Sequence, residues 1–348
     1  MGTSHALAYH HSPDFEIVGL VNRGEKGRDR LSRALQALGG NYATFSNYEE
    51  ALAKTQPDAV CISTYPDTHA PYATLALQHG CHVFLEKPVA VDLEEARRLI
   101  ALSHQVQRKL VIGYILQHHP SWSRFVEEAR KLGKPLVMRM NLNQQSSGQE
   151  WETHKNIMRS MPPMVDCGVH YVDVMCRMTQ SRPVRVHAIA ARLSHDLQEG
   201  EFNYGQLQVS FEDGSVGWYE AGWGPMMSQT AFFVKDVIGP LGSVSIAGDS
   251  QTPNASDDVN AHTRTDALQV HHAALDAAGA FVHPDRRLAT SGEPDHDALC
   301  ALEQAFFATA IQEDKDLSGH LAAALDSLQI VLAAEESART GEVVHLHR

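Results

Sequence analysis

Residues 58–88, DAVCISTYPDTHAPYATLALQHGCHVFLEKP, decide the predicted fold. Two apolar, β-rich runs, DAVCIS (58–63) and CHVFLE (81–86), lie on either side of a segment with a helical pattern. Runs of the same kind precede and follow them at 16–21 (EIVGLV) and 109–114 (KLVIGY). Strands that alternate with helices predict a parallel sheet, and strands that are apolar along their whole length predict helices on both of its faces. The first part of the chain is therefore predicted to be α/β.

The pattern changes after about residue 120. Helix-like segments at 121–132 and 164–178 precede strand-like stretches from 183 to 247, and two more helices are expected at 296–312 and 319–338. The dipeptide Asp213-Gly214 lies between two extended runs and predicts a hairpin turn with antiparallel strands. The polar segment 248–265 is predicted to be a loop. The second part is thus expected to be α+β.

Composition and charge exclude several classes of protein. The 348 residues suffice for two domains, and 43% apolar with 20% charged residues is typical of a globular protein. The net charge is −13 and no basic stripe occurs, which argues against nucleic acid and anionic membranes as partners. No apolar run approaches the roughly 20 residues of a membrane span, and no targeting segment is visible at the N-terminus. We expect a cytoplasmic protein.

Cysteine and histidine usage predicts neither disulfides nor a metal site. The five cysteines are widely spread and form no CxxC pair, so we interpret them as reduced, mostly buried thiols. The 21 histidines include three His-His doublets, but no HExxH or comparable ligand spacing occurs. No metal ligands are therefore assigned.

A partial dinucleotide-binding pattern occurs at the N-terminus. Gly2 opens a helical segment, and the next predicted strand ends in Asn22-Arg23, 20 positions after Gly2. In a Rossmann βαβ unit the last glycine packs the helix start against the pyrophosphate, and a residue about 20 positions later meets the adenosine ribose. Asn22 lacks a carboxylate that would repel a 2′-phosphate and Arg23 can pair with one, which slightly favours NADP over NAD. Arg23 as an adenine-stacking or solvated side chain stays an open alternative.

The same pattern lacks its beginning, because the preceding strand and the first two glycines are absent. Either the chain begins downstream of the natural start, or the fold lacks a central strand. Loss of a central strand would expose two unpaired sheet edges. We therefore favour a start further upstream.

Two polar segments follow predicted strands. TYPDTH (64–69) follows the strand at 58–63, and Glu86-Lys87-Pro88 ends the strand at 81–86. Open α/β sheets bind ligands at the carboxyl ends of their strands. The Lys87 ammonium can hydrogen-bond a substrate hydroxyl there and stabilise developing negative charge. A surface pair of Glu86 and Lys87 is the structural alternative.

A third segment, DCGVHYVD (166–173), places a carboxylate and an imidazole one helical turn apart. Asp166 and His170 are four positions apart and therefore share a helix face, with Asp173 three positions later. Such a pair can take a hydroxyl proton while hydride leaves the same carbon, because histidine titrates near neutral pH. A purely structural hydrogen-bonded pair is the alternative.

Together, the N-terminal pattern, TYPDTH, EKP and DCGVHYVD resemble the glucose-fructose oxidoreductase and inositol dehydrogenase (Gfo/Idh/MocA) family over most of the chain. The resemblance implies a Rossmann dinucleotide-binding domain at 1–114. It also implies a substrate-binding and oligomerisation domain at 115–348 with an open, mainly antiparallel sheet. The implied activity is NAD(P)-dependent hydride transfer at a hydroxyl or carbonyl carbon of a sugar, sugar derivative or cyclitol. A dimer or tetramer of identical subunits is the implied assembly.

The resemblance also implies roles for single residues. Lys87 would contact the reacting hydroxyl and the nicotinamide ribose, Asp166 would be the carboxylate of the helix motif, and His170 its acid/base. The residues that would lie under or beside the nicotinamide half of the cofactor are Thr64, Pro66, His69 and Glu86. The family often has an Arg before an aromatic residue and a Pro where this chain has Gln117-His118-His119-Pro120, which puts substrate contacts there in doubt.

Two other function classes stay open. A non-catalytic regulator would bind dinucleotide and sense it, and an NAD-dependent glycosidase would oxidise a sugar carbon transiently without net cofactor turnover. The presence of Lys87, Asp166 and His170 together argues against the regulator. The glycosidase is not excluded by any residue of the sequence.

Overall fold

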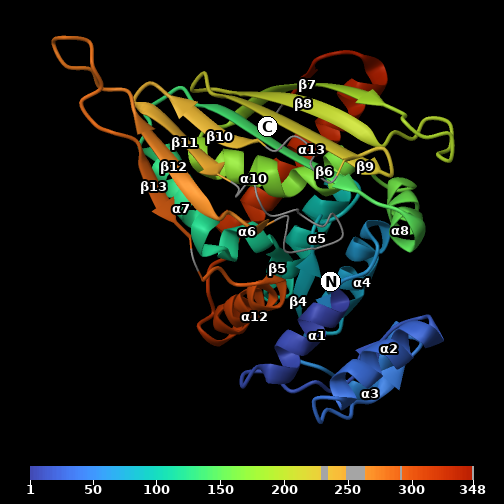
Figure 1. The fold of residues 1–348 in the computed structure, drawn as a ribbon. Coiled ribbons are helices and arrows are strands. Elements are labelled where there is room, and N and C mark those ends of the chain that lie inside the picture. The colour runs from blue at the N-terminus through green and yellow to red at the C-terminus, as the bar shows by residue number, and fades with distance from the viewer. Residues whose placement is uncertain (229–233, 248–262, 291, 347–348) are drawn as a thin grey trace. The chain divides into compact units, whose positions relative to one another are not determined.

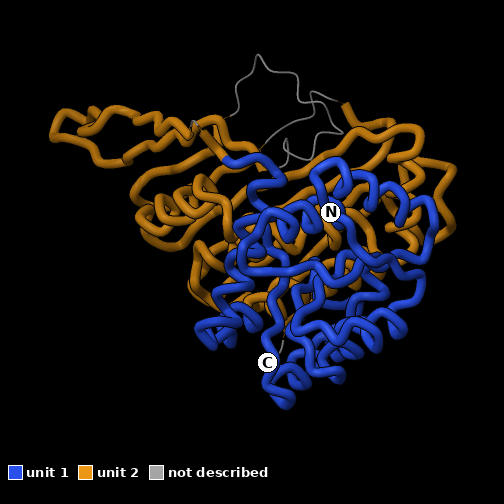
Figure 2. Tube along the Cα trace, turned by 90° about the horizontal axis from the view of Figure 1, so that it is seen from below, with its two compact units in different colours: residues 1–115, 294–322 blue, residues 116–293, 323–348 orange. Residues whose placement is uncertain are grey.

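The computed structural model describes residues 1–228, 234–247, 263–290 and 292–346. The chain forms two compact units, the first made of residues 1–115 and 294–322 and the second of 116–293 and 323–348 (Figure 2). The first boundary lies one residue from the predicted one. The segment 294–322, assigned to the second domain from the sequence, belongs to the first unit because α12 (His296–Gln312) packs against α1 (Gly2–His11).

The first unit contains two parallel ladders. Strands β3 (Ala59–Ile62), β4 (His82–Glu86) and β5 (Leu110–Gly113) form one, and β1 (Leu20–Val21) and β2 (Thr44–Phe45) form the other (Figure 1). The predicted parallel strands are confirmed, and the described residues contain no ladder between β1 and β3. The prediction of a strand over 16–21 was too long, because only its last two residues have ladder partners.

Helices connect these strands, and local sequence fixes where several of them begin. The Asp92 carboxylate accepts a hydrogen bond from the Glu95 amide at 2.9 Å, and the Asn47 side chain accepts one from the Glu50 amide at 2.8 Å. Both are helix caps that satisfy free amide donors. The helices of this unit are α1, α2 (Glu25–Gln36), α3 (Tyr48–Thr55), α4 (His69–Gln78), α5 (Leu93–Gln105) and α12, with a 3₁₀ turn at Pro66–Thr68.

Aromatic packing holds α12 in the first unit. The Phe307 ring on α12 stacks on Phe15, with 5.9 Å between centroids, and lies 6.0 Å from Phe84 on β4. Phe84 and Phe307 are fully buried. A segment nearly 300 residues from the N-terminus thus completes the core around α1, and no local pattern in the sequence signals that.

The second unit is built on a nine-stranded sheet in the order β13-β12-β11-β10-β6-β9-β8-β7-β14. All neighbours pair antiparallel except β6 and β9, which are parallel. The predicted turn at Asp213-Gly214 is confirmed, with Gly214 at φ +82°. The strands are β6 (Val137–Gln145), β7 (Pro183–Ala191), β8 (Tyr204–Phe211), β9 (Val216–Gly224), β10 (Lys235–Gly239), β11 (Gly242–Ala247), β12 (Ala267–His272), β13 (Arg286–Ala289) and β14 (Val344–His345).

The helix predicted over 164–178 is two helices, α9 (Pro163–Asp166) and α10 (Gly168–Thr179), joined at Cys167. The His170 amide donates to the Cys167 carbonyl three positions back, so the turn is tighter here than in an α-helix. A Cβ at Gly168 would lie 3.2 Å from the Val331 side chain and 3.3 Å from Tyr219. Close packing at this glycine therefore accompanies the break between Asp166 and His170.

The remaining helices are α6 (Ile115–His118), α7 (Pro120–Arg130), α8 (Gly148–Met158) and α13 (Ser318–Thr340). Residues 248–262 of the predicted loop at 248–265 lie outside the described residues. Thr263 and Thr265, at its end, are buried. None of the helices in the described part of the chain combines the length and apolar character needed to cross a membrane.

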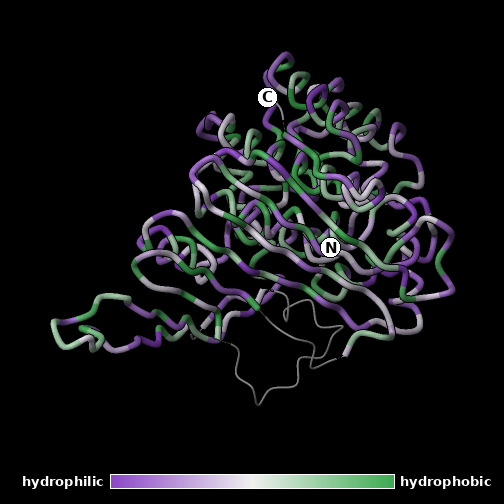
Figure 3. Tube along the Cα trace, turned by 90° about the horizontal axis from the view of Figure 1, so that it is seen from above, coloured by the Kyte–Doolittle hydropathy of each residue, from purple (hydrophilic) through white to green (hydrophobic). Residues whose placement is uncertain are grey.

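The connection between β12 and β13 projects from the sheet of the second unit (Figures 1 and 3). Leu275 and Phe281 form a bridge across it, and both side chains are more than half exposed. Val282 next to them is half exposed. This projection thus carries three large apolar side chains in contact with solvent.

Strand β10 contains a buried lysine. The Lys235 side chain is 2% exposed, donates to the Asn141 carbonyl at 3.2 Å, and its Nζ lies 5.5 Å from the centre of the Tyr171 ring. Burial lowers the pKa of Lys235 to about 7. The folded unit therefore disfavours the charged form that the unfolded chain prefers up to a pH of about 10.4.

This difference predicts how stability depends on pH. Since the unfolded chain binds a proton that the fold disfavours, stability should fall as the pH drops from about 10 toward 7. Lys235→Met should therefore raise the free energy of unfolding at pH 7 by on the order of 1 kcal/mol or more, and by less at pH 9. Urea unfolding at both pH values measures this, with exposed Lys26→Met as the control. A Lys235→Met variant less stable than wild type at pH 7 would contradict it.

Candidate functional site

The carboxyl edge of the three-stranded ladder gathers the predicted ligand-binding segments of the first unit. Ile62 pairs with Leu85, and Glu86 pairs with Gly113, so the three strands end at neighbouring positions. Residues 63–68 and the EKP segment leave the sheet from this edge. Parallel pairing thus brings together two motifs that are about 20 residues apart in the sequence.

Gly2 lies at this same edge. A Cβ at Gly2 would be 2.9 Å from Oγ of Ser63, so the start of α1 lies directly against the loop that follows β3. A larger residue at this position would force the Ser63 side chain to move. The first amides of α1 carry the partial positive charge of a helix N-terminus, which is suited to an anionic group such as a pyrophosphate.

Asn22 and Arg23 follow β1, and both are exposed. The Asn22 amide donates to the Phe45 carbonyl at 3.1 Å, and its side-chain oxygen accepts from the Gly24 amide at 2.9 Å. Arg28 donates to the carbonyls of Asn22 and Arg23. The turn after β1 is therefore fixed by hydrogen bonds of its backbone to Phe45 and to the Asn22 and Arg28 side chains, and the Arg23 side chain lies at the surface of this unit.

His69 joins the loops that follow β3 and β4. Its Nδ1 lies 2.8 Å from the Pro88 carbonyl and its Nε2 lies 3.1 Å from the Thr64 carbonyl. Burial lowers the pKa of His69, so the neutral ring donates to one of these carbonyls at a time. Pro66 in this loop is buried, whereas Thr64 is exposed and accepts a hydrogen bond from Thr68 at 2.7 Å. His69 thus links the loop after β3 to the segment after β4.

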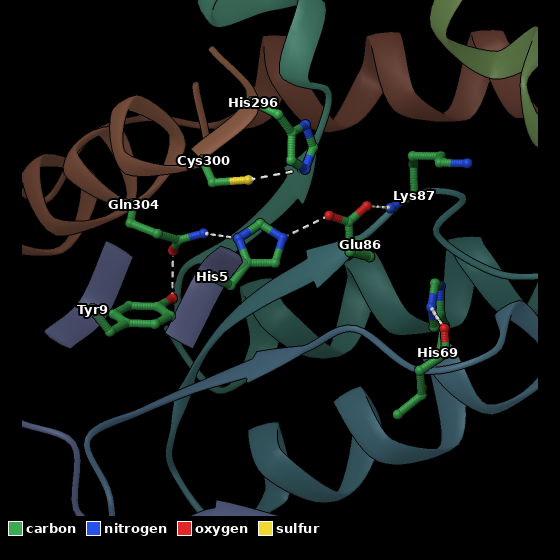
Figure 4. Close-up of polar contacts among 9 residues, drawn as sticks. His5, Tyr9, His69, Glu86, Lys87, His296, Cys300 and Gln304 are labelled. Carbon is green, nitrogen blue, oxygen red and sulfur yellow. Dashed lines mark hydrogen bonds and ion pairs between the residues drawn. The ribbon is translucent and has the colours of Figure 1, made fainter. Parts of the chain in front are cut away.

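Glu86 points into the first unit (Figure 4). It is 6% exposed; one carboxylate oxygen lies 2.7 Å from Nε2 of His5, and the other accepts from the Lys87 amide at 3.2 Å. Nδ1 of His5 lies 3.0 Å from the Gln304 amide nitrogen. Glu86 therefore ties the strand end to α1 and, through His5, to α12. Lys87 follows it, half-buried, with a cis peptide bond to Pro88.

In the second unit, Asp166 is the last residue of α9, and His170 lies in the first turn of α10. Asp166 is 9% exposed, and one of its oxygens lies 3.8 Å from the Cys167 sulfur. His170 is half-buried in the first turn of α10. Lys87 belongs to the first unit, so the three predicted catalytic residues come from both units.

The structure adds three residues that the sequence did not single out as a group. The His154 ring stacks on Trp223 with 4.3 Å between centroids, and the Trp223 indole donates to Gln144 at 2.6 Å. Gln144 also accepts from the Cys167 thiol at 3.5 Å. Burial lowers the pKa of His154 to about 4, with Asp166 opposing the shift. These side chains come from β6, α8 and β9, so sequence spacing alone could not associate them.

The structure also shows the surroundings of Gln117 and His118, which follow β5. Gln117 donates from its amide to both carboxylate oxygens of Asp173, at 3.0 Å each. Burial raises the pKa of Asp173 to about 6, although this bond opposes the shift. Burial lowers the pKa of neighbouring His118 to about 4. Gln117 is thus used inside the second unit to hold α10.

A parallel ladder with polar segments at its carboxyl edge, together with a separate unit built on an open mixed sheet, defines a two-unit α/β protein of the dinucleotide-binding class. Residues 1–114 match a family model described as an oxidoreductase family with an NAD-binding Rossmann fold. Residues 126–245 match the Gfo/Idh/MocA C-terminal domain. The chain belongs to the Gfo/Idh/MocA family of oxidoreductases.

Relatives are similar at low identity. The chain is 24% identical over 356 residues to scyllo-inositol 2-dehydrogenase (NAD(+)) of Bacillus subtilis (strain 168), covering 98% of this chain and 93% of that protein. It is 26% identical over 189 residues to UDP-N-acetylglucosamine 3-dehydrogenase of Acidithiobacillus ferrooxidans, but the match spans only about half of each protein, 54% of this chain and 56% of that one. The structure of GenD2 from gentamicin A biosynthesis in complex with NAD matches with a TM-score of 0.76 at 19% identity, covering 100% of this chain and 94% of that chain.

The contacts of His69 predict a measurable loss of order in the loop. His69→Ala removes the donor shared by two carbonyls, one of them on Pro88, and should lower the free energy of unfolding by about 1–3 kcal/mol. Exchange of amide hydrogens in residues 64–68 should quicken more than in α5. Thermal unfolding and hydrogen exchange measure both. Exposed His195→Asn is the control, and unchanged exchange in the loop would show that His69 does not hold it.

Proposed function

We propose that this chain transfers a hydride between a nicotinamide dinucleotide and a hydroxyl or carbonyl carbon of a sugar, sugar derivative or cyclitol. The observation that carries the proposal is the edge of the first unit, where the start of α1 lies against the loop after β3 and the EKP segment follows β4. Two relatives at low identity are named as dehydrogenases of an inositol and of a nucleotide sugar. Their substrates supply the proposed class.

The residues at this edge fit a dinucleotide. Gly2 is a cradle position, because a side chain there would meet Ser63. The amides at the start of α1 would bind the pyrophosphate, Asn22 and Arg23 the adenosine ribose, and the loop held by His69 the nicotinamide half, where Glu86 and Lys87 follow. The set contains a helix start without a side-chain cap for the anion and an arginine for a 2′-phosphate. The bound cofactor would accept or supply the hydride.

The chain's own residues would handle the proton and the oxygen. The Lys87 ammonium would hydrogen-bond the substrate oxygen and stabilise the negative charge that develops when its proton leaves. His170 would take that proton in oxidation and return it in reduction. Asp166 would orient the imidazole and bind a neighbouring hydroxyl. A polyhydroxylated substrate suits these donors and acceptors.

If Lys87 and His170 have these roles, replacing either residue should lower catalytic efficiency to a similar extent. Lys87→Met and His170→Asn should each lower kcat/KM by about 100-fold or more with melting temperatures near that of wild type, because each removes an acid/base or charge-stabilising group. The assay follows nicotinamide absorbance with a panel of inositols, glucosides and nucleotide sugars. Lys26→Met and His195→Asn are the controls.

The possible outcomes separate the function classes. Loss of activity in both variants supports the roles proposed here. Turnover equal to wild type in both would overturn them. Release of a sugar from an aryl glycoside without change in nicotinamide absorbance would show a redox-neutral glycosidase instead. Dinucleotide binding without turnover of any substrate would favour a regulator.

The choice between NAD and NADP is tested at Arg23. If its guanidinium pairs with a 2′-phosphate, Arg23→Ala should weaken NADPH binding about tenfold or more and leave NADH binding within a factor of about two. Fluorescence titration with each reduced cofactor measures the two dissociation constants, with exposed Arg30→Ala as the control. Equal losses for the two cofactors would mean that Arg23 contacts the adenine or ribose and does not read the phosphate.

A further inference from the structure

The first unit contains a buried group of metal-ligating side chains between α1 and α12. One ring nitrogen of His5, the sulfur of Cys300 and a carboxylate oxygen of Glu303 all lie within 4.8 Å of one another. All three residues are at most 1% exposed. It is the only such group among the described residues, and neither the catalytic proposal nor the dinucleotide proposal uses it.

The spacing on α12 favours convergence on one point. His296, Cys300 and Glu303 are four and three positions apart, so they share one face of the helix. Nε2 of His296 lies 3.6 Å from the Cys300 sulfur. Ligands at the usual zinc distances in a tetrahedron are separated by about 3.3–3.8 Å. His296 is thus adjacent to the Cys300 ligand but outside the group of three converging atoms, and its ring would have to shift to serve as a fourth ligand.

The surroundings of the Glu303 carboxylate independently favour a bound cation. Glu303 is 1% exposed, and neither of its carboxylate oxygens has a hydrogen-bond partner among the described residues. A proton would remove the charge but leave acceptor oxygens unsatisfied, whereas a cation would compensate the charge and occupy an acceptor.

A histidine that binds a metal through one ring nitrogen usually donates a hydrogen bond from the other, and Glu86 is the acceptor of such a bond from His5. The Glu86 carboxylate lies 2.7 Å from Nε2 of His5, which fixes the proton on that nitrogen and leaves the Nδ1 lone pair for another partner. In this structure Nδ1 lies 3.0 Å from the Gln304 amide nitrogen. A metal ion would take the place of this amide, which is next to Glu303 on the same helix.

We propose that His5, Cys300 and Glu303, joined by His296 after a shift of its ring, form a binding site for one Zn²⁺ or a similar borderline-soft divalent cation, which clamps α1 to α12. Imidazole, thiolate and carboxylate are the ligands that zinc takes in proteins. The thiolate and the carboxylate together balance the charge of the ion. With His296 as the fourth protein ligand, no coordination position would stay open for a substrate, so the role is structural: the ion fixes the helix whose first residues lie at the dinucleotide edge.

The test uses the full-length chain, stripped of metal with a chelator and titrated with Co²⁺ and Zn²⁺. One Co²⁺ per chain should bind and give the thiolate-to-cobalt charge-transfer absorption and the intense visible bands of tetrahedral coordination. Zn²⁺ should displace it and raise the melting temperature. Cys300→Ser should abolish the charge-transfer band and weaken binding at least tenfold. Cys81→Ser, at another buried cysteine of the same unit whose thiol donates to the Pro57 carbonyl, should keep both.

Glu303→Gln keeps the test decisive if Cys300→Ser does not fold. This variant removes a buried carboxylate without changing its shape, so it should fold as well as the metal-free wild type while binding Co²⁺ at least tenfold more weakly. Absence of stoichiometric binding to the wild type would overturn the proposal. So would charge-transfer absorption that survives Cys300→Ser, or affinity that Glu303→Gln leaves unchanged. Because the readout is binding and not turnover, the result is independent of the proposed hydride transfer.

Discussion

The parallel pairing of β3, β4 and β5 is the constraint on which the first unit depends. Parallel strands need a crossover helix between them, and such a sheet is covered on its faces by those helices. Each strand therefore ends at the same edge, where the chain must turn into a loop before the next helix. The loop after β3, the EKP segment after β4 and the start of α1 meet there for this reason. The predicted ligand-binding segments therefore lie where the pairing of the strands ends.

Buried polar contacts behind this edge hold it in place. The Glu86 carboxylate binds His5, and His5 in turn meets Gln304 on α12 (Figure 4). The strand end, the N-terminal helix and the returning helix are thus linked through side chains that are almost fully buried. Hydrogen bonds of this kind give little net stability, but leaving any partner unmade costs much more. Each of these side chains therefore has a defined partner. The same arrangement places the Glu86 carboxylate near the carboxylate of Glu303.

The second unit uses its sheet differently. The mixed sheet supports α9 and α10, and the helix breaks at Cys167, where the turn between Asp166 and His170 is tighter than in an α-helix. Close to Asp166, the His154 ring stacks on Trp223, and the Trp223 indole donates to Gln144. Burial keeps His154 neutral at ordinary pH.

The amino-acid sequence by itself determined the strand-helix alternation, the hairpin at Gly214, the caps of the helices and the motifs at the strand ends, because these depend on periodicity and on contacts between near neighbours. It also predicted α12 at its observed bounds. Only the tertiary structure decided that α12 returns to the first unit, that β6 pairs parallel with β9, and that His5 meets Glu86 and Cys300. These contacts join residues 79 to almost 300 positions apart, and spacing in a sequence carries no signal for pairs that only packing brings together.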